Sequence, residues 1–190
     1  NFRLYPEYME ELFKALRKLP LHGWTAQAEQ MVADHPELLS LAREAHLDKL
    51  FIGFESANPH NRQELGGKAK GNIERYREVI QRIHAAGIGA VGLFVFGFDG
   101  DPPSIFEHTY DFMRTSGLDG ISITVLTPYV GTPQREKWLQ EDRLLPNVPW
   151  SLYDTNHVTY YPAQMTPAEL AQGYDWLSGK LYGWSGIATR

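Results

Sequence analysis

The chain has 190 residues, of which 43% are hydrophobic and 22% are charged, and its formal net charge is -5. These values describe a globular protein long enough for one full domain. The negative net charge argues against non-specific binding to nucleic acid, which needs a basic surface. The sequence has no cysteine, which excludes disulfides, thiolate nucleophiles and cysteine-held metal or iron–sulfur sites within the chain. It also has no apolar run long enough to cross a membrane, so we expect a cytoplasmic protein.

Apolar periodicity divides the first two thirds of the chain into alternating helices and strands. Helical spacing is clearest over 72–86, where Asn72 is a suitable N-cap and Gly87 a suitable stop. A short run rich in Phe and Val, 91–98, is typical of a strand buried on both faces. In chain order, the predicted elements are helix 5–18, strand 21–27, helix 35–46, strand 50–55, helix 72–86, strand 91–98, helix 103–115 and strand 121–126.

Strands that alternate with helices at this spacing predict an α/β fold with a parallel sheet and right-handed crossovers. Only about four strands are present, whereas a closed barrel has eight, so we expect a partial TIM-like barrel or a small open sheet over residues 1–133. Trp, Tyr and Pro become frequent after Pro128, and Thr166, Pro167 and Glu169 form a capping box that predicts a helix to about Leu181. We interpret residues 134–190 as a mainly helical, aromatic-rich extension packed on the barrel.

Polar residues follow three of the predicted strands: Glu55-Ser56, Asp99-Gly100-Asp101 and Thr127-Pro128-Tyr129. The carboxyl ends of parallel strands share one rim, and α/β folds bind ligands there. Glu55 is the preferred candidate, because a carboxylate at a strand end suits a bidentate hold on vicinal hydroxyls. The alternative is that Glu55 caps a helix or pairs with Arg62.

Two other segments have both a ligand-binding and a structural interpretation. Asp99 and Asp101 carry oxygen ligands that suit a divalent cation, but we favour turn and cap roles, with Asp101 or Ser104 capping the helix that follows. The loop 66–71 (GGKAKG) precedes a helix and is suited to hold an anion, although it lacks the spacing of a P-loop. No metal site is predicted.

Eight segments, taken in order, resemble one family. They are 50–56 (LFIGFES), 68–76 (KAKGNIERY), 84–88 (HAAGI), 92–101 (GLFVFGFDGD), 126–133 (LTPYVGTP), 150–154 (WSLYD), 162–170 (PAQMTPAEL) and the tail 182–190. The series resembles the radical S-adenosylmethionine (radical SAM) superfamily, in the branch whose members usually carry an upstream cobalamin-binding domain and are often called Fe-S oxidoreductases. The resemblance covers essentially the whole chain.

The resemblance implies a partial (β/α)6 barrel of which this chain supplies strands three to six. It implies S-adenosylmethionine and a 4Fe-4S cluster as cofactors, and it leaves open whether cobalamin is used. The family holds the cluster on a CxxxCxxC loop, which this chain lacks, and the chain opens on Asn1 rather than Met. We therefore expect the C-terminal part of the catalytic domain of an Fe-S oxidoreductase or methyltransferase, inactive alone, whose partners are the missing barrel half, a possible cobalamin-binding domain and a small-molecule substrate.

The resemblance also places individual residues against the polar half of the cofactor. Glu55 matches the position at the end of the family's fourth strand that holds the ribose hydroxyls, and Ser56 is the alternative contact. Lys68 lies near the basic position that meets the carboxylate of S-adenosylmethionine, and Lys70 competes for that role.

Four further residues match positions beside the adenine. Val95 matches an apolar position on the fifth strand that packs against the base, and Gly97 allows a close approach. Leu126 and Thr127 match the end of the sixth strand, where backbone groups contact adenine. No residue matches a substrate contact, and no catalytic residue is assigned.

Two other interpretations stay open. The chain is alternatively a cluster-free half-barrel that serves as a binding or scaffolding module, or a small α/β enzyme that binds a phosphorylated ligand through 66–71. A half-barrel leaves an open strand edge and an exposed apolar face. We therefore expect this chain to form a homodimer or to pair with the missing half.

Overall fold

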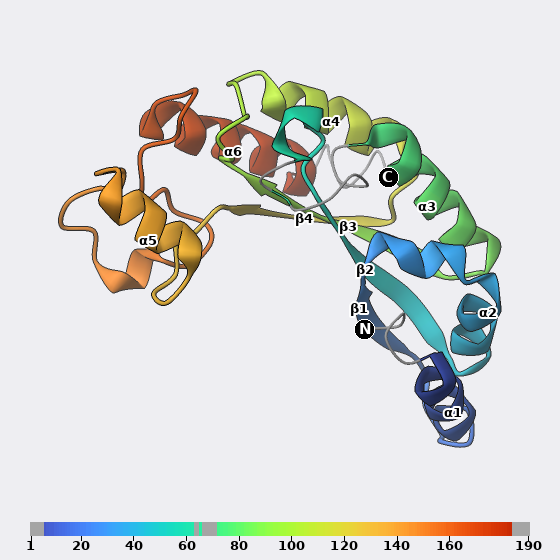
Figure 1. The fold of residues 1–190 in the computed structure, drawn as a ribbon. Coiled ribbons are helices and arrows are strands. Elements are labelled where there is room, and N and C mark those ends of the chain that lie inside the picture. Colours follow the sequence, from blue (N-terminus) through green and yellow to red (C-terminus); the bar gives the residue numbers. More distant parts are fainter. Residues whose placement is uncertain (1–5, 63–64, 66–71, 184–190) are drawn as a thin grey trace. The chain divides into compact units, whose positions relative to one another are not determined.

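The structure is a computed structural model, and it describes residues 6–62, 65 and 72–183. Helices and strands alternate along most of the chain, and short 3-10 helices (η) lie between some of them (Figure 1). Their order is α1 (Pro6–Leu16), β1 (Trp24–Ala28), η1 (Gln30–Asp34), α2 (Pro36–Glu44), β2 (Leu47–Glu55), η2 (Pro59–Arg62), α3 (Ile73–Ala85), β3 (Gly89–Phe96), α4 (Ile105–Thr115), β4 (Gly120–Val125), α5 (Pro133–Gln140), η3 (Trp150–Leu152) and α6 (Pro167–Tyr182).

The strands form one four-stranded sheet in the order β1-β2-β3-β4. β1 and β2 are parallel, with Ala26 opposite Leu50. Between β3 and β4, the Asp119 amide donates to Ala90 O and the Leu126 amide to Phe96 O, so the pairing advances in the same direction on both strands. The predicted α/β fold with four parallel strands is confirmed.

Contacts divide the chain into two compact units. Residues 1–54, 72–93 and 112–122 form unit 1, and residues 55–71, 94–111 and 123–190 form unit 2. The carboxyl ends of β2, β3 and β4 therefore belong to unit 2, as do all the residues predicted to bind the cofactor. The boundary predicted between residues 133 and 134 stays a prediction.

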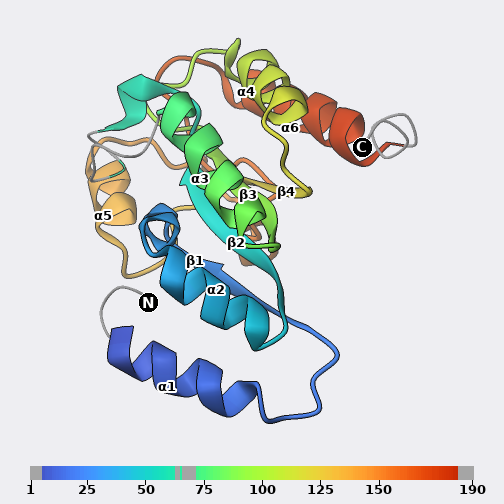
Figure 2. The same cartoon turned by 90° about the vertical axis from the view of Figure 1, so that its right-hand side faces the viewer.

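Unit 1 is built around apolar helix faces. α3 begins where the sequence predicts, because the Asn72 side chain accepts a hydrogen bond from the Arg75 amide. Its buried Tyr76 donates a hydrogen bond of 2.7 Å to Phe54 O and packs its ring 4.4 Å from that of Phe54. α1 packs beside α2, and η1 contacts both α2 and α3 (Figure 2).

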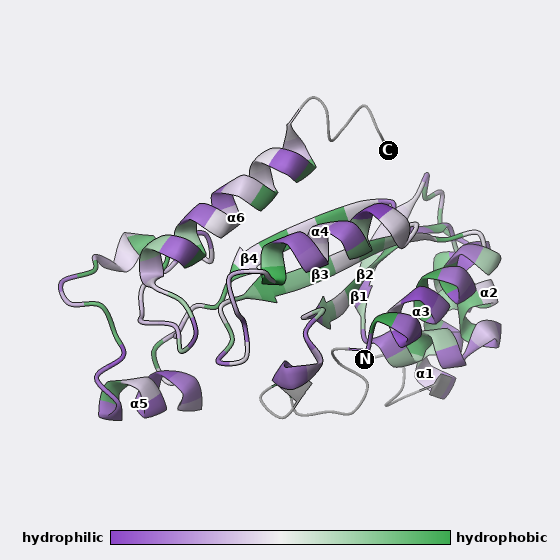
Figure 3. Ribbon diagram, turned by 90° about the horizontal axis from the view of Figure 1, so that it is seen from above, coloured by the Kyte–Doolittle hydropathy of each residue, from purple (hydrophilic) through white to green (hydrophobic). Residues whose placement is uncertain are grey.

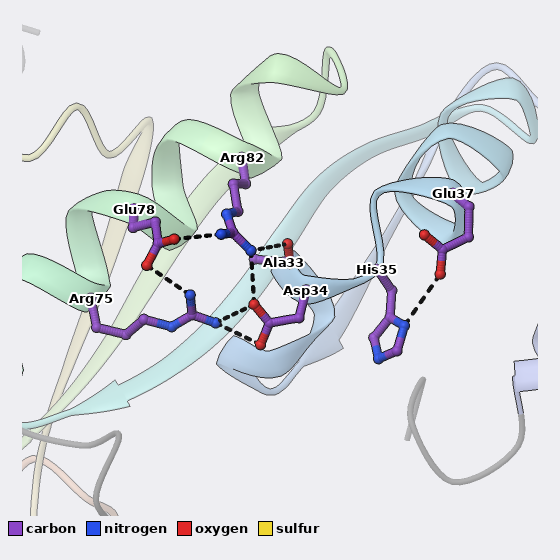
Figure 4. Close-up of polar contacts among 7 residues, drawn as sticks. All are labelled: Ala33, Asp34, His35, Glu37, Arg75, Glu78 and Arg82. Atoms are coloured by element: carbon purple, nitrogen blue, oxygen red, sulfur yellow. Dashed lines mark hydrogen bonds and ion pairs between the residues drawn. The ribbon is translucent and has the colours of Figure 1, made fainter.

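A network of charged side chains fastens η1 to α3 (Figure 4). Arg75 donates two hydrogen bonds of 2.7 Å to the Asp34 carboxylate, and Arg82 donates one of 2.8 Å to it. Arg82 also donates to Ala33 O, and Glu78 accepts from both arginines. The network joins the end of η1 to two successive turns of α3.

β3 is mainly hydrophobic (Figure 3), but its second half is not buried on both faces. In β3, Phe94 and Phe96 are buried, whereas Leu93 and Val95 are partly exposed. The prediction of a strand buried on both faces is therefore wrong for this part. The reason is that helices bury one face: Phe96 stacks on Phe106 of α4 at 4.9 Å, and Val95 points the opposite way.

The C-terminal helix forms as predicted. Thr166 and Glu169 make the reciprocal bonds of a capping box, and α6 runs to Tyr182. It packs closely on α4, because a Cβ at Gly173 would lie 2.1 Å from the Phe106 ring. Tyr110 and Trp176 make an edge contact between the same helices. None of the described helices combines the length and apolar character that a membrane crossing requires.

Candidate cofactor site

Glu55 ends β2 in a strained backbone conformation. Its φ is 67°, in the left-handed region that a residue with a Cβ seldom adopts. Such a conformation costs on the order of 1–3 kcal/mol and is concentrated at functional sites. Glu55 is partly exposed, whereas its neighbours Phe54 and Ser56 are buried. The local structure therefore leaves Glu55 partly exposed and buries the residues on either side of it.

Val95 is also partly exposed between buried neighbours, and Leu126 and Thr127 are partly exposed after the buried Val125. Leu126 continues the line of β4, because its amide donates a hydrogen bond of 2.9 Å to Phe96 O. The Thr127 side chain turns back and donates to Val125 O at 3.0 Å. Two apolar side chains and the strand-end backbone thus stand at the carboxyl ends of neighbouring strands, and their contact with adenine stays a prediction.

Gly97 has a structural role that the sequence reasoning missed. Its φ is 98°, and a Cβ at this position would lie 2.0 Å from the Tyr160 hydroxyl oxygen. That hydroxyl donates a hydrogen bond of 2.6 Å to Gly97 O. The space left by the missing side chain is therefore occupied by Tyr160, and the predicted approach of adenine to Gly97 stays a prediction.

Ser56 belongs to a buried hydrogen-bond network. Its hydroxyl oxygen accepts from the Asn58 amide at 3.0 Å and from Asn61 Nδ2 at 2.9 Å. This placement favours Glu55 over Ser56 as the contact for a ligand. Lys68 and Lys70, the rest of loop 66–71 and the Arg62 side chain lie outside the residues whose placement is described.

Asp101 is the centre of that network, so of the two residues expected to cap the next helix, Asp101 or Ser104, Asp101 is not the cap, and Ser104 directly precedes α4. α4 begins only at Ile105, and Asp101 is completely buried. Its carboxylate accepts four hydrogen bonds, from Asn61 Nδ2 (2.6 Å), Asn58 Nδ2 (3.3 Å), the Gly97 amide (3.0 Å) and the Phe98 amide (3.1 Å). Burial raises the pKa of Asp101 even though all four hydrogen bonds act to lower it.

Asp99 is an ion-pair partner for the extension and does more than form a turn. Arg143 donates to it at 2.6 Å, and Lys137 lies 3.5 Å from its other oxygen. Burial alone would raise the pKa of Asp99, but the hydrogen bond and charge of Arg143, assisted by Lys137, outweigh burial and lower this pKa. Gln164 donates to Asp99 O. Within the described part of the chain, no group of three or more His, Asp or Glu side chains is placed to hold a metal ion.

A buried aromatic pair supports Tyr160. Trp138 of α5 is fully buried and stacks on the Tyr160 ring at 4.1 Å, and the Arg143 guanidinium lies 4.8 Å from the Trp138 ring. Sequence reasoning identified aromatic burial in the extension but not these partners. The available signal was the pair Thr132-Pro133, which marks the start of α5 in the same way that Thr166-Pro167 marks α6.

Comparisons with known proteins fit this fold. The family model of the Radical SAM superfamily matches residues 1–113. Bacteriochlorophyllide d C-12(1)-methyltransferase of Chlorobaculum tepidum is 30% identical over 190 residues, which is 100% of this chain and 41% of that protein. Hopanoid C-2 methylase of Rhodopseudomonas palustris is 28% identical over 119 residues, which is 63% of this chain and 22% of that protein.

Two solved structures share the fold over 92% of this chain. One is TsrM of Kitasatospora setae, a radical S-adenosylmethionine methyltransferase with cobalamin and a [4Fe-4S] cluster bound, at a TM-score of 0.58 and 15% identity. The other is OxsB, a cobalamin-dependent S-adenosylmethionine radical enzyme, at 0.61 and 13%. The chain spans 36% and 32% of these two proteins. On the match to the family model and the likeness to the Chlorobaculum methyltransferase, the chain belongs to the radical SAM superfamily.

Proposed function

We propose that this chain forms the ribose- and adenine-binding side of the S-adenosylmethionine site in a radical SAM enzyme of the methyltransferase type. The observation that carries the proposal is Glu55, a partly exposed residue with a strained backbone that ends β2 between two buried neighbours. Two methylating relatives support the reaction class.

The residues present suit the cofactor chemically. A carboxylate accepts hydrogen bonds from both ribose hydroxyls, which suits Glu55. Partly exposed Val95 and Leu126 offer apolar surface to the adenine ring. Within the described residues, the Leu126 carbonyl and the Thr127 amide have no hydrogen-bond partner. Because they belong to one trans peptide group, they point in opposite directions, and one of the two, the acceptor or the donor, can meet the edge of adenine.

The cluster ligands must come from outside these 190 residues, because the sequence has no cysteine. When bound, S-adenosylmethionine and the 4Fe-4S cluster together supply the superfamily's radical chemistry. The contribution of the residues described here is to hold and orient the nucleoside end. We further propose that cobalamin, where it is used, is bound by a domain beyond this chain. This chain covers only 36% of TsrM and 32% of OxsB, which leaves room for such a domain.

The methyl acceptor is proposed to be a large, mainly apolar ring compound. The names of the Chlorobaculum and Rhodopseudomonas relatives specify a bacteriochlorophyllide and a hopanoid, which are both polycyclic compounds. Unit 2 of this chain exposes Val130 (69%) and Tyr129 (46%) in the loop after β4. Apolar side chains exposed beside a ligand-binding rim support a substrate of this class.

The test is Glu55→Gln in the complete, anaerobically reconstituted enzyme. Loss of the negative charge weakens the hydrogen bonds to both ribose hydroxyls, and charge-assisted bonds contribute roughly 1.5–3 kcal/mol. We expect S-adenosylmethionine to bind about tenfold to a hundredfold more weakly, as measured by equilibrium dialysis of labelled cofactor.

Glu107→Gln is the matched control, because Glu107 is an exposed carboxylate of α4 in the same unit. It should bind the cofactor as the wild type does. Wild-type affinity in Glu55→Gln would contradict the ribose role. A stoichiometric cluster assembled on the 190-residue chain alone, with iron and sulfide, would contradict the proposal that the cluster ligands lie elsewhere.

A further inference from the structure

The buried carboxylate of Asp101 divides its hydrogen bonds between two loops. Its Oδ2 accepts from the Gly97 and Phe98 amides, which belong to the loop after β3. Its Oδ1 accepts from Nδ2 of Asn58 and of Asn61, which belong to the segment after β2. We call these five residues the Asp101 cluster. One side chain thereby fastens together the two segments that follow neighbouring strands.

All four partners of the Asp101 carboxylate are hydrogen-bond donors. Only an ionised carboxylate can accept from all of them, because a protonated acid or an amide would turn a donor toward another donor. Burial opposes this ionisation and raises the pKa of Asp101. The fold thus retains a buried charge that reduces stability, which is typical of sites shaped for function.

The cluster reaches the proposed cofactor residues from both sides. Asn61 also donates to the hydroxyl of Ser56, the residue directly after Glu55. Gly97 lies two residues after Val95, and its left-handed backbone is held by the hydrogen bond from its amide to Asp101. A change at Asp101 therefore acts on the backbone next to Glu55 and on the backbone next to Val95.

We infer that Asp101 is a positioning residue of the S-adenosylmethionine site, which sets the ribose-binding end of β2 against the adenine-binding end of β3 without touching the cofactor. This inference rests on the proposed function for its ligand. The clamp, meaning the four hydrogen bonds by which Asp101 joins the two loops, lies entirely within unit 2 and does not depend on the cofactor.

Asp101→Asn tests the inference with almost no change of shape. The new amide oxygen can accept from the Gly97 and Phe98 amides, but its NH2 group then faces Nδ2 of Asn58 and Asn61. We expect the complete enzyme to bind S-adenosylmethionine at least tenfold more weakly. We also expect faster hydrogen exchange at the amides of residues 56–61 and 97–101, with far-UV circular dichroism showing that the chain is still folded at the assay temperature.

The exchanged pair Asp101→Asn with Asn61→Asp is the rescue. Here the amide NH2 introduced at position 101 donates to the new carboxylate at position 61, and the amide oxygen at position 101 keeps the two backbone N–H groups. We expect cofactor affinity and amide protection to return most of the way to wild type. If Asp101→Asn does not fold, Asn61→Ala replaces it, since this change removes the 2.6 Å link from Asp101 to the segment after β2.

The outcomes separate the inference from the proposed function. Faster exchange and weaker binding in Asp101→Asn, both restored by the exchanged pair, support the inference. Unchanged affinity and exchange in Asp101→Asn, while Glu55→Gln binds weakly, overturn it and leave the proposed function standing. Faster exchange in Asp101→Asn, with no effect of Glu55→Gln on binding, supports the clamp and overturns the ribose role of Glu55.

Discussion

Gly97 and Gly100 are glycines because other side chains occupy the positions of their missing Cβ atoms. A Cβ at Gly97 would lie 2.0 Å from the Tyr160 hydroxyl, and one at Gly100 would lie 2.2 Å from Asn61 Oδ1. Real Cβ atoms do not approach other atoms so closely, so something would have to move. The loop after β3 is thus shaped on one side by the extension and on the other by the segment after β2.

Gly97→Ala should destabilise unit 2. A left-handed alanine costs roughly 1–2 kcal/mol, and displacing the buried Tyr160 adds roughly 1–3 kcal/mol of overpacking. We expect urea unfolding to show a loss of about 2–5 kcal/mol in total, which is the sum of those two ranges.

Tyr160→Phe provides the matched partner for a double-mutant cycle. By itself it loses the hydrogen bond to Gly97 O, worth about 1 kcal/mol. In the Gly97→Ala background the same change removes the nearest clashing atom and leaves Leu170 Cδ2 at 2.9 Å, so the double variant should lose less than the sum of the single losses. Strictly additive losses would show that contact with Tyr160 is not the reason why position 97 requires glycine.

The candidate site could be predicted from sequence only in part. Glu55 stands out as a carboxylate that ends an apolar strand, and that signal is local. The importance of Asp101 depends on Asn58 and Asn61, which precede it by 43 and 40 residues. No local pattern distinguishes such a buried hub from an ordinary turn aspartate, because both follow glycine in a loop.

Elements were easier to predict than their partners. Every predicted helix and strand between residues 5 and 126 exists, because apolar period and caps are local properties. β2 begins earlier than predicted, at Leu47 rather than Leu50, since Leu47 and the exposed Lys49 pair with β1 and the exposed Asp48 lies at the register shift between them. α5 was not separately predicted, because its pattern of apolar residues is weak and only Trp138 is buried.

The attachment of η1 to α3 leads to a prediction about Asp34. Asp34→Asn replaces the carboxylate that accepts from both Arg75 and Arg82. Because Asp34 and Arg82 are exposed and Arg75 is only partly buried, we expect a loss of only about 1 kcal/mol in the free energy of unfolding. The loss should shrink between about 0.1 and about 1 M salt, as the Debye length falls to about 3 Å.

Glu37→Gln is the control for Asp34→Asn. Glu37 is an exposed carboxylate two residues into α2, and its side-chain contact is His35 (Figure 4). It should change stability by less than about 0.5 kcal/mol. Equal losses in the two variants, or a loss in Asp34→Asn that ignores salt, would argue against the charged network as the fastening of η1.

At the scale of the whole molecule, β1 is an edge strand of the sheet, as the predicted half-barrel requires. Its Thr25 and Gln27 side chains are exposed. An edge strand has backbone groups able to pair with a further strand. Whether a second copy of this chain or another barrel half provides that strand stays a prediction.

The two aspartates of the loop after β3 give the molecule opposite responses to pH. The folded pKa of Asp99 is lowered, so its contribution to stability is present above the unfolded value of about 3.9 and is lost as the pH falls through the folded pKa. The folded pKa of Asp101 is raised, so its contribution is present below about 3.9 and is lost as the pH rises through the folded pKa. Asp99 therefore changes stability at pH values below about 4, and Asp101 at pH values above about 4.

Asp101→Asn should therefore alter the pH dependence of stability only on the neutral side of that value. Urea unfolding at a series of pH values from about 3 to about 7 should show a wild-type stability that declines, relative to Asp101→Asn, as the pH rises above about 4. The offset from unmet hydrogen bonds in the variant is the same at every pH and does not obscure the slope. Asp99→Asn should differ from the wild type in slope only below about pH 4. Parallel curves for wild type and Asp101→Asn would mean that Asp101 titrates alike in the folded and unfolded chain, and the four hydrogen bonds of the clamp would then offset the whole cost of burying the charge.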